Sequence, residues 1–234
     1  MKTVSHTDET AKLMVERFCN HVFWLRLVRH DFKELFENEK SKILMKRTAP
    51  SFFADLNRIL HSYLLLEFVK ITDPKTSGRK QERENFTVNN LIESIVWPRE
   101  VSEKLRSVGD KAMAFRRRIL DVRNKLLAHI DKGVFLTDTI LGEFPEGEDE
   151  AFLRTLEEVC NITYKACFGS IFGQINVVKP GDVINFKRAL ANAVAFDELL
   201  SESRGQEKAR LFSYLQKAIP KTSLNNSTNG GLKT

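Results

Sequence analysis

Helix-breaking residues are rare along this chain, and their scarcity restricts the fold more than any other feature of the sequence. Only 11 glycines and 6 prolines are spread over 234 residues, which are too few for the many turns of an all-β fold. Apolar residues recur instead three and four positions apart, as on one face of an α-helix. The pattern therefore predicts an all-α fold, a bundle of about five to seven helices with long antiparallel helices.

The breaks in this periodic pattern set the predicted helix bounds. Pro50 and Pro98 are suited to the first turn of a helix, and the residue before Pro74 is disfavoured inside one. We expect helices over residues 7–38, 50–71, 87–97, 98–130, 150–175, 182–200 and 206–219, with exposed connections over 75–85 and 132–149. One helical domain is predicted over residues 1–219, followed by a disordered C-terminal tail over 220–234.

Composition and targeting signals narrow the class of protein. With 42% hydrophobic and 29% charged residues, the chain has the balance of a folded globular protein rather than a disordered one. No apolar run is long enough to span a bilayer, and the first residues lack the apolar core of a signal peptide. Three cysteines, Cys19, Cys160 and Cys167, form no disulfide framework. We therefore expect a cytoplasmic protein with no membrane partner and no structural disulfide.

The positive charge is compatible with a nucleic-acid partner, but it does not define one. The formal net charge is +6, and the basic residues are not gathered into one tract. The densest run is Arg116-Arg117-Arg118. Such runs usually lie on a solvated helix face, and contact with the phosphates of an RNA strand is the second interpretation.

Other charged residues suggest no metal or cofactor site. His21 and His30 are not part of a His-Glu-x-x-His motif, so they predict no zinc site, and no nucleotide-binding glycine motif occurs. Asp31 and Glu34 are expected to pair with Arg26 or Arg29 on a solvated face of the first helix.

One arginine is placed unusually. On a helical projection of residues 113–130, Arg123 falls inside the apolar arc, and Arg116 shares its stripe one heptad earlier. The arc is formed by Phe115, Ile119, Leu120, Val122, Leu126, Leu127 and Ile130. A guanidinium on an apolar face needs carboxylates, carbonyl oxygens or a bound anion to offset its desolvation.

Two interpretations of this arginine remain open from the pattern alone. In the structural one, Arg123 pairs with an acidic residue of a neighbouring helix, such as Asp55 or Glu67, and His129 interacts with the helix C-terminus. In the functional one, both side chains bind a phosphate. Arg123 and His129 are separated by about 9 Å along a straight helix, so one copy of the pair does not form a compact site.

The string Asp121-Val122-Arg123-Asn124-Lys125-Leu126-Leu127-Ala128-His129-Ile130-Asp131 resembles the Arg-polar-x(n)-His signature of HEPN domains. The wider string, together with the apolar helix that ends at Ile71-Thr72-Asp73 and the following polar loop, is similar to the abortive-infection AbiU-type branch. The resemblance covers roughly residues 53–131.

This resemblance implies a helical HEPN-like bundle that forms a homodimer with two copies of the motif in one cleft. It implies a metal-independent endoribonuclease of a toxin or antiphage system, without a cofactor. His129 would be the general acid/base, Arg123 would hold the scissile phosphate, and Asn124 would position them. RNA would also contact Arg116, Arg117 and Lys125.

Two further expectations accompany this interpretation. A nucleotidyltransferase-like antitoxin is a candidate partner. The alternative function is a non-catalytic HEPN-like helical module that binds RNA or a partner protein, with Arg123 in a structural ion pair.

Overall fold

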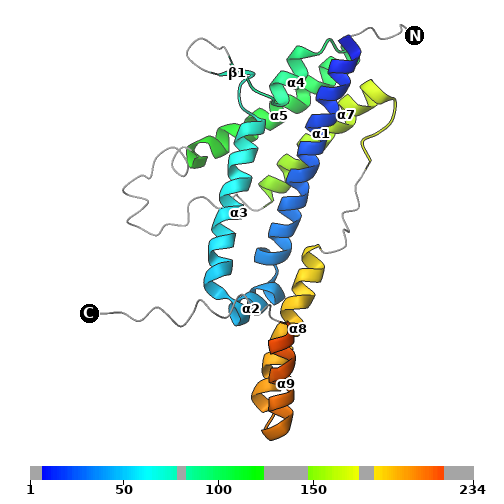
Figure 1. The fold of residues 1–234 in the computed structure, drawn as a ribbon. Helices are drawn as coiled ribbons and strands as arrows, with labels where there is room; N and C mark the ends of the chain where they lie inside the picture. Colours follow the sequence, from blue (N-terminus) through cyan, green and yellow to red (C-terminus); the bar gives the residue numbers. More distant parts are fainter. Residues whose placement is uncertain (1–6, 78–82, 124–146, 174–181, 219–234) are drawn as a thin grey trace.

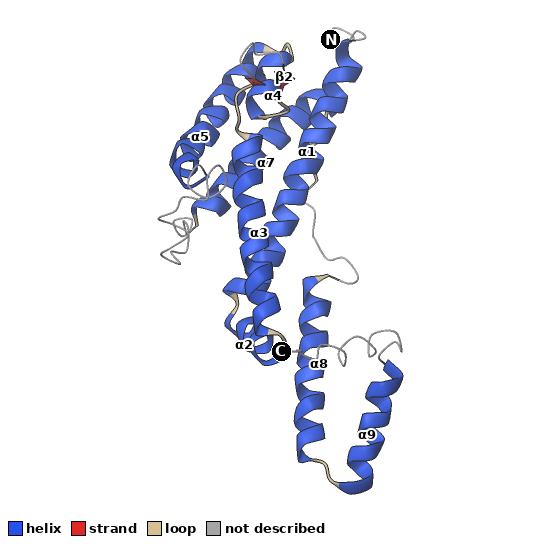
Figure 2. Cartoon of the chain, turned by 60° about the vertical axis from the view of Figure 1, so that its left-hand side comes forward, coloured by secondary structure: helices blue, strands red, loops and turns tan. Residues whose placement is uncertain are grey.

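The computed structural model describes residues 7–77, 83–123, 147–173 and 182–218, and these form an all-α bundle (Figures 1 and 2). The described elements are α1 (Thr7–Phe32), the π-helical turn η1 (Lys33–Glu37), α2 (Glu39–Thr48), α3 (Pro50–Ile71), β1 (Thr76–Ser77), β2 (Arg83–Glu84), α4 (Val88–Ser94), α5 (Arg99–Arg123), α7 (Glu148–Phe168), α8 (Val183–Glu202) and α9 (Gly205–Ala218). The all-α prediction is confirmed. No described helix is long and apolar enough to cross a membrane.

Four long helices, α1, α3, α5 and α7, surround the main core. Each packs against two others: α1 lies between α3 and α7, and α5 lies between the same two helices on the other side. Contacts between distant residues show that neighbours run antiparallel. On α1 and α7, for example, Cys19 lies near Cys160 whereas Arg29 lies near Asp149.

Aromatic rings from three helices meet at the centre of this core. Phe115 of α5 stacks on Phe152 of α7 with ring centroids 4.1 Å apart, and Phe68 of α3 meets both rings edge-on. All three side chains are buried. Rings in such arrangements add to the stabilisation from burying their apolar area, so this triad joins α3, α5 and α7.

A second, smaller apolar cluster attaches the C-terminal helices. Leu35, Met45, Phe53 and Val183 are buried together, joining η1, α2 and α3 to the start of α8. In Figures 1 and 2, α2 lies at one end of the bundle, and α8 and α9 extend beyond that end. The prediction of one domain over 1–219 stays a prediction, and the tail over 220–234 lies outside the described residues.

The helix bounds follow local signals, with four departures from prediction. The predicted first helix changes to a π-helical turn after Phe32, and the unpredicted α2 follows, capped by the Asn38 side chain on the amide of Ser41. Ile95, three residues before Pro98, adopts an extended conformation, so α4 ends at Ser94 rather than Trp97.

The other two departures are at a helix end and in a loop. The predicted helix to residue 175 ends at Phe168, because Gly169 adopts a left-handed conformation with φ 72°. The expected loop over 75–85 contains two antiparallel strands of two residues each, with Thr76 opposite Glu84. The predicted helix ends at residues 130 and 219 fall outside the described residues.

The aromatic triad provides the first test of the fold. We expect Phe152→Ala to lower the free energy of unfolding by about 3–5 kcal/mol, because it removes a buried ring and leaves a cavity. Urea denaturation followed by circular dichroism measures this change. Phe168→Ala, on a ring that is 39% exposed, should cost less than about 1.5 kcal/mol. Equal losses in the two variants would contradict the central position of the triad.

The seam between α1 and α3 contains a titratable group. His21 Nε2 lies 3.4 Å from Glu67 Oε2, and Glu67 also accepts from Lys70 at 2.8 Å. Burial lowers the pKa of His21 below 6.5; Glu67 opposes this shift and Lys70 adds to it. The folded protein therefore favours neutral His21, and its contribution to stability is present above the unfolded pKa and lost as the pH falls.

We expect the free energy of unfolding to fall more steeply below about pH 6.5 in the wild type than in His21→Gln, because the glutamine does not titrate. Urea denaturation at a series of pH values measures both slopes. Parallel profiles would show that His21 does not contribute to the pH dependence.

Candidate functional site

The predicted catalytic string begins at the C-terminal end of α5. Arg123 is the last residue of that helix in the described part of the chain. Its side chain, and all of Asn124, Lys125 and His129, lie outside the described residues. The roles of these four residues stay predictions, and the described structure defines the helices on either side of them.

Arg116 connects the last turns of α5 to the end of α3. Its guanidinium donates to Asp73 Oδ1 at 2.6 Å and to the carbonyl oxygen of Val69 at 3.3 Å, and its side chain is 15% exposed. A cation at the last carbonyl groups of a helix is favoured by the helix dipole. Arg116 therefore orients α5 on α3, and an RNA contact through this residue would compete with the Asp73 pair.

Arg117 and Arg118, which follow Arg116 on α5, do not contact α3 through the pair described above. Arg117 is exposed, as a phosphate-binding side chain needs to be. Arg118 donates to Glu148 Oε2 at 2.9 Å, which joins the end of α5 to the first residue of α7. The end of α5 and the start of α7 therefore lie at the same end of the bundle.

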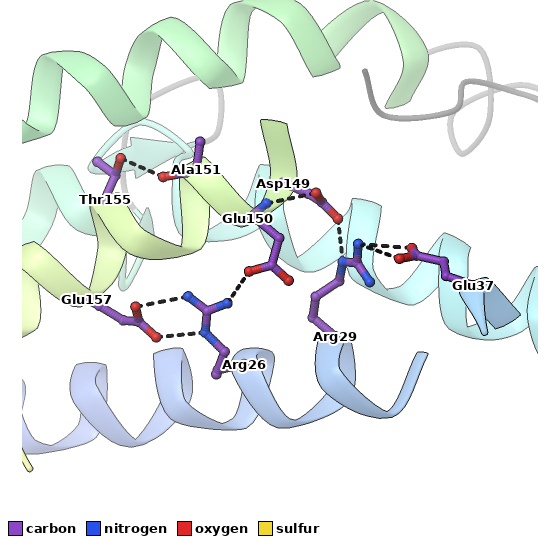
Figure 3. Close-up of polar contacts among 8 residues, drawn as sticks. All are labelled: Arg26, Arg29, Glu37, Asp149, Glu150, Ala151, Thr155 and Glu157. Carbon is purple, nitrogen blue, oxygen red and sulfur yellow. Dashed lines mark hydrogen bonds and ion pairs between the residues drawn. The ribbon is translucent and has the colours of Figure 1, made fainter. Parts of the chain in front are cut away.

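The first turn of α7 is fixed by a buried ion pair. Gly147 precedes the helix in a left-handed conformation, with φ 77°. Asp149, two residues later, accepts from Nε of Arg29 on α1, and the two side chains are 6% and 7% exposed (Figure 3). Glu37 of η1 binds the same guanidinium from the other side, with 2.9 Å between Nη2 and Oε1.

A second arginine extends this network along α7. Arg26 makes a two-pronged contact with Glu157, at 2.7 and 2.9 Å, and also donates to Glu150 (Figure 3). Burial opposes the charge on both arginines. Burial alone would lower the pKa of each arginine, but the hydrogen bonds and negative charges of the carboxylate partners have the larger effect. The pKa values of Arg26 and Arg29 are therefore raised above the ordinary value. Both guanidinium groups therefore stay charged in the folded protein.

These contacts correct the expectation of a solvated face on the first helix. Arg26 and Arg29 pair with α7 and η1 instead of with Asp31 or Glu34. Glu34 accepts from Lys187 of α8 at 2.7 Å, and this hydrogen bond lowers the pKa of Glu34. Sequence spacing suggested local pairs, whereas the real partners lie more than a hundred residues away for Arg26 and for Glu34.

One donor in the network has no described acceptor. Arg29 Nη1 is buried, and no residue in the described ranges accepts a hydrogen bond from it. Four carboxylates approach the two arginines, so an anion would be repelled here, and the network is suited to holding α1, η1 and α7 together rather than to binding phosphate.

A shallow cavity of about 250 Å³ lies over the seam between α5 and α7. It is lined by Lys111, Ala114, Phe115, Arg118, Glu148, Ala151, Phe152 and Thr155. Its two cations are paired with carboxylates, Lys111 with Glu158 and Arg118 with Glu148. The lining is therefore not a free basic site. Among the described residues, no group of His, Cys, Asp and Glu is arranged to hold a metal ion.

The described helices form an all-α bundle, and the Arg-polar-x(n)-His string starts where α5 ends. A family model of HEPN domains, described as AbiU2, matches residues 8–174. The chain belongs to the AbiU2 family of HEPN domains, an abortive-infection branch. The match includes α1 to α7 and stops before α8. Comparison with curated proteins found no match, and neither did comparison with solved structures.

The Arg29–Asp149 pair can be tested directly. We expect Asp149→Asn to lower the free energy of unfolding by about 3–5 kcal/mol, because it leaves the buried Arg29 cation without its nearest counter-charge. Chemical denaturation measures the loss. Glu198→Gln, in the exposed Arg47–Glu198 pair of 2.7 Å, is the control and should cost less than about 1 kcal/mol.

A double variant tests whether removing both charges of this pair restores the stability that is lost when only one is removed. Arg29→Met with Asp149→Leu removes both charges and keeps the side-chain volume, so it should recover most of the stability that Asp149→Asn loses. A double variant less stable than the single one would show that the charges themselves are required.

Proposed function

We propose that this protein is a metal-independent endoribonuclease of a toxin or antiphage defence system. The proposal is supported chiefly by membership of the AbiU2 HEPN family, because the matched region includes the Arg123–His129 string. The end of α5 and the start of α7 support it further. They are joined by Arg118 and Glu148, so the helix that leads into the string is fixed against the start of α7.

The proposed reaction is internal attack by a 2′-hydroxyl of RNA on the adjacent phosphorus. The new P–O2′ bond forms as the bond from phosphorus to the 5′-oxygen of the next nucleotide breaks. A base removes the proton of the 2′-hydroxyl, and an acid protonates the leaving 5′-oxygen. The products are a 2′,3′-cyclic phosphate and a 5′-hydroxyl.

The residue types in the string suit each of these steps. An imidazole titrates near neutral pH, so His129 is the proposed general acid/base. A guanidinium contacts two phosphate oxygens at once, so Arg123 is proposed to hold the scissile phosphate and to stabilise the charge that develops on it. Asn124 is proposed to position the two.

Two copies of the string are needed for a compact site. On one straight helix Arg123 and His129 are about 9 Å apart along the axis. This distance does not prevent a compact site if Arg123 of one subunit acts with His129 of a second. We therefore propose a composite site in a homodimer. Arg117 and Lys125 are the proposed RNA contacts beside it, Arg116 contributes by orienting α5, and a nucleotidyltransferase-like antitoxin is the proposed restraining partner.

We expect His129→Ala to cleave RNA about 10²–10⁴ times more slowly than the wild type, because general acid/base catalysis contributes on that scale. Purified proteins are assayed on single-stranded RNA, and the product ends are analysed for the cyclic phosphate. His30→Ala, which changes a histidine of α1 outside the Arg123–Asp131 string, should cleave at the wild-type rate. Adding EDTA should also leave the rate unchanged.

The same assay distinguishes the non-catalytic alternative. If wild-type protein binds RNA without cleaving it, the chain is a binding module. If His129→Ala cleaves and inhibits cell growth like the wild type, His129 is not part of the machinery and the catalytic assignment is wrong.

A further inference from the structure

The cavity over the seam between α5 and α7 lies beside the helix that leads into the Arg123–Asp131 string. Its volume is about 250 Å³, slightly below the range of about 300–1,000 Å³ that is typical of pockets for small molecules. The space is therefore suited to one ring system of a ligand rather than to a large molecule.

The bottom of the cavity is apolar. Phe115 and Phe152, which stack on each other and are each 2% exposed, line it together with Ala114 of α5 and Ala151 of α7. Since both alanines carry only a methyl group, the two helices leave a hollow above the rings. A flat apolar surface of a ligand can fill this hollow and displace water from it.

The rim of the cavity is polar but balanced in charge. Lys111 Nζ lies 3.8 Å from Glu158 Oε2, and Arg118 Nε donates to Glu148 Oε2 at 2.9 Å. Because each cation has a carboxylate partner, a phosphate group would have to displace that partner. The rim therefore favours an uncharged ligand with hydrogen-bond donors and acceptors.

Donors and acceptors for such a ligand lie on opposite walls. On the α5 wall, the bond from Arg118 to Glu148 uses Nε, and the guanidinium has two further nitrogens that donate. On the α7 wall, that bond uses one of the two carboxylate oxygens of Glu148. Thr155, whose hydroxyl donates to the carbonyl oxygen of Ala151 at 3.0 Å, can also accept (Figure 3). A matching ligand has acceptors on one edge and donors on the next.

Guanine is the RNA base with this arrangement. Its O6 and N7 are adjacent acceptors for arginine or lysine, and its N2 amino group is a donor, whereas adenine presents one acceptor beside its amino group. We propose that the cavity binds a guanine base of the RNA substrate. Arg118 donates to O6 and N7, Glu148 accepts from N2, and the apolar bottom contacts the ring.

This inference rests on the proposed function, because it names a base preference of that ribonuclease. Sequence spacing agrees with the link. Lys111, Arg118 and the proposed RNA contact Lys125 are seven positions apart, so a helical projection of the sequence places them on one stripe. The proposed guanine site itself consists of described residues alone, and these residues contact substrate away from the reacting atoms.

Cleavage of a single-stranded RNA pool of random sequence tests the preference. We expect wild-type cuts to have guanine at one fixed position relative to the cut, about 10-fold more often than adenine. Ala151→Leu and Ala114→Leu fill the cavity from its two walls and keep the ion pairs of the rim, so each should abolish this preference. Ala54→Leu, at an exposed alanine of α3, is the matched control and should keep it. Sequencing the products gives the positions.

Inosine, which lacks the N2 amino group of guanine, tests the contact with Glu148. Replacing the preferred guanine of a short RNA by inosine should raise the KM of the wild type about 10-fold and leave kcat unchanged, because the lost contact binds substrate and transition state equally. Glu148→Ala should have the same KM for both RNAs. A KM ratio as large in Glu148→Ala as in the wild type would show that Glu148 does not accept from the base.

Thermal unfolding confirms that the variants are folded. A wild type without a base preference, a preference for another base, or a guanine preference that survives in Ala151→Leu would overturn the inference and leave the ribonuclease assignment intact. If the wild type binds RNA without cleaving it, the ribonuclease assignment alone is wrong, and fluorescence anisotropy with the guanine and inosine RNAs tests the cavity in the same variants. A protein that neither binds nor cleaves RNA would reject both.

Discussion

The buried pair between Arg29 and Asp149 is the interaction on which the rest of the structure depends. It fixes the first turn of α7 against α1, and Glu37 on the opposite side of the guanidinium brings in the turn after α1. Burying such charges is costly, so the pair is stable only with its hydrogen bonds intact. The same first turn carries Glu148, which binds Arg118 of α5. One end of the bundle is therefore specified by charges, whereas the aromatic triad specifies its centre by packing.

Much of the bundle could be predicted from the sequence, because its helices obey local rules. Pro50 begins α3, Thr87 caps α4, and Asp182 caps α8 by accepting from the amides of Ile184 and Asn185. The unpredicted α2 had a comparable signal in Asn38, but its apolar residues are few. No local signal predicted the π-helical turn, in which Glu34 and Glu37 contact other elements.

The candidate site also has a part that the sequence predicts and a part that it does not. Its catalytic string could be recognised as a short run of residue types, and membership of the AbiU2 family agrees with that recognition. The contacts on either side of the string could not be predicted. Spacing along one helix placed Arg116 beside Arg123 but did not reveal Asp73, and Arg26 and Arg29 suggested only local pairs. Partners brought together by tertiary packing leave no periodic pattern in a single sequence.

The π-helical turn sets the spacing of two contacts with other elements. A π-helical turn holds one more residue than an α-helical turn, and here Glu34 contacts Lys187 of α8 while Glu37 contacts Arg29 of α1, which also binds Asp149 of α7. Removing one residue between the two glutamates would turn Glu37 by about 100° about the helix axis relative to Glu34. Lys187 and Arg29 would then no longer both meet their carboxylates. The length of this turn therefore matters more than its composition for joining α8 to α1 and α7.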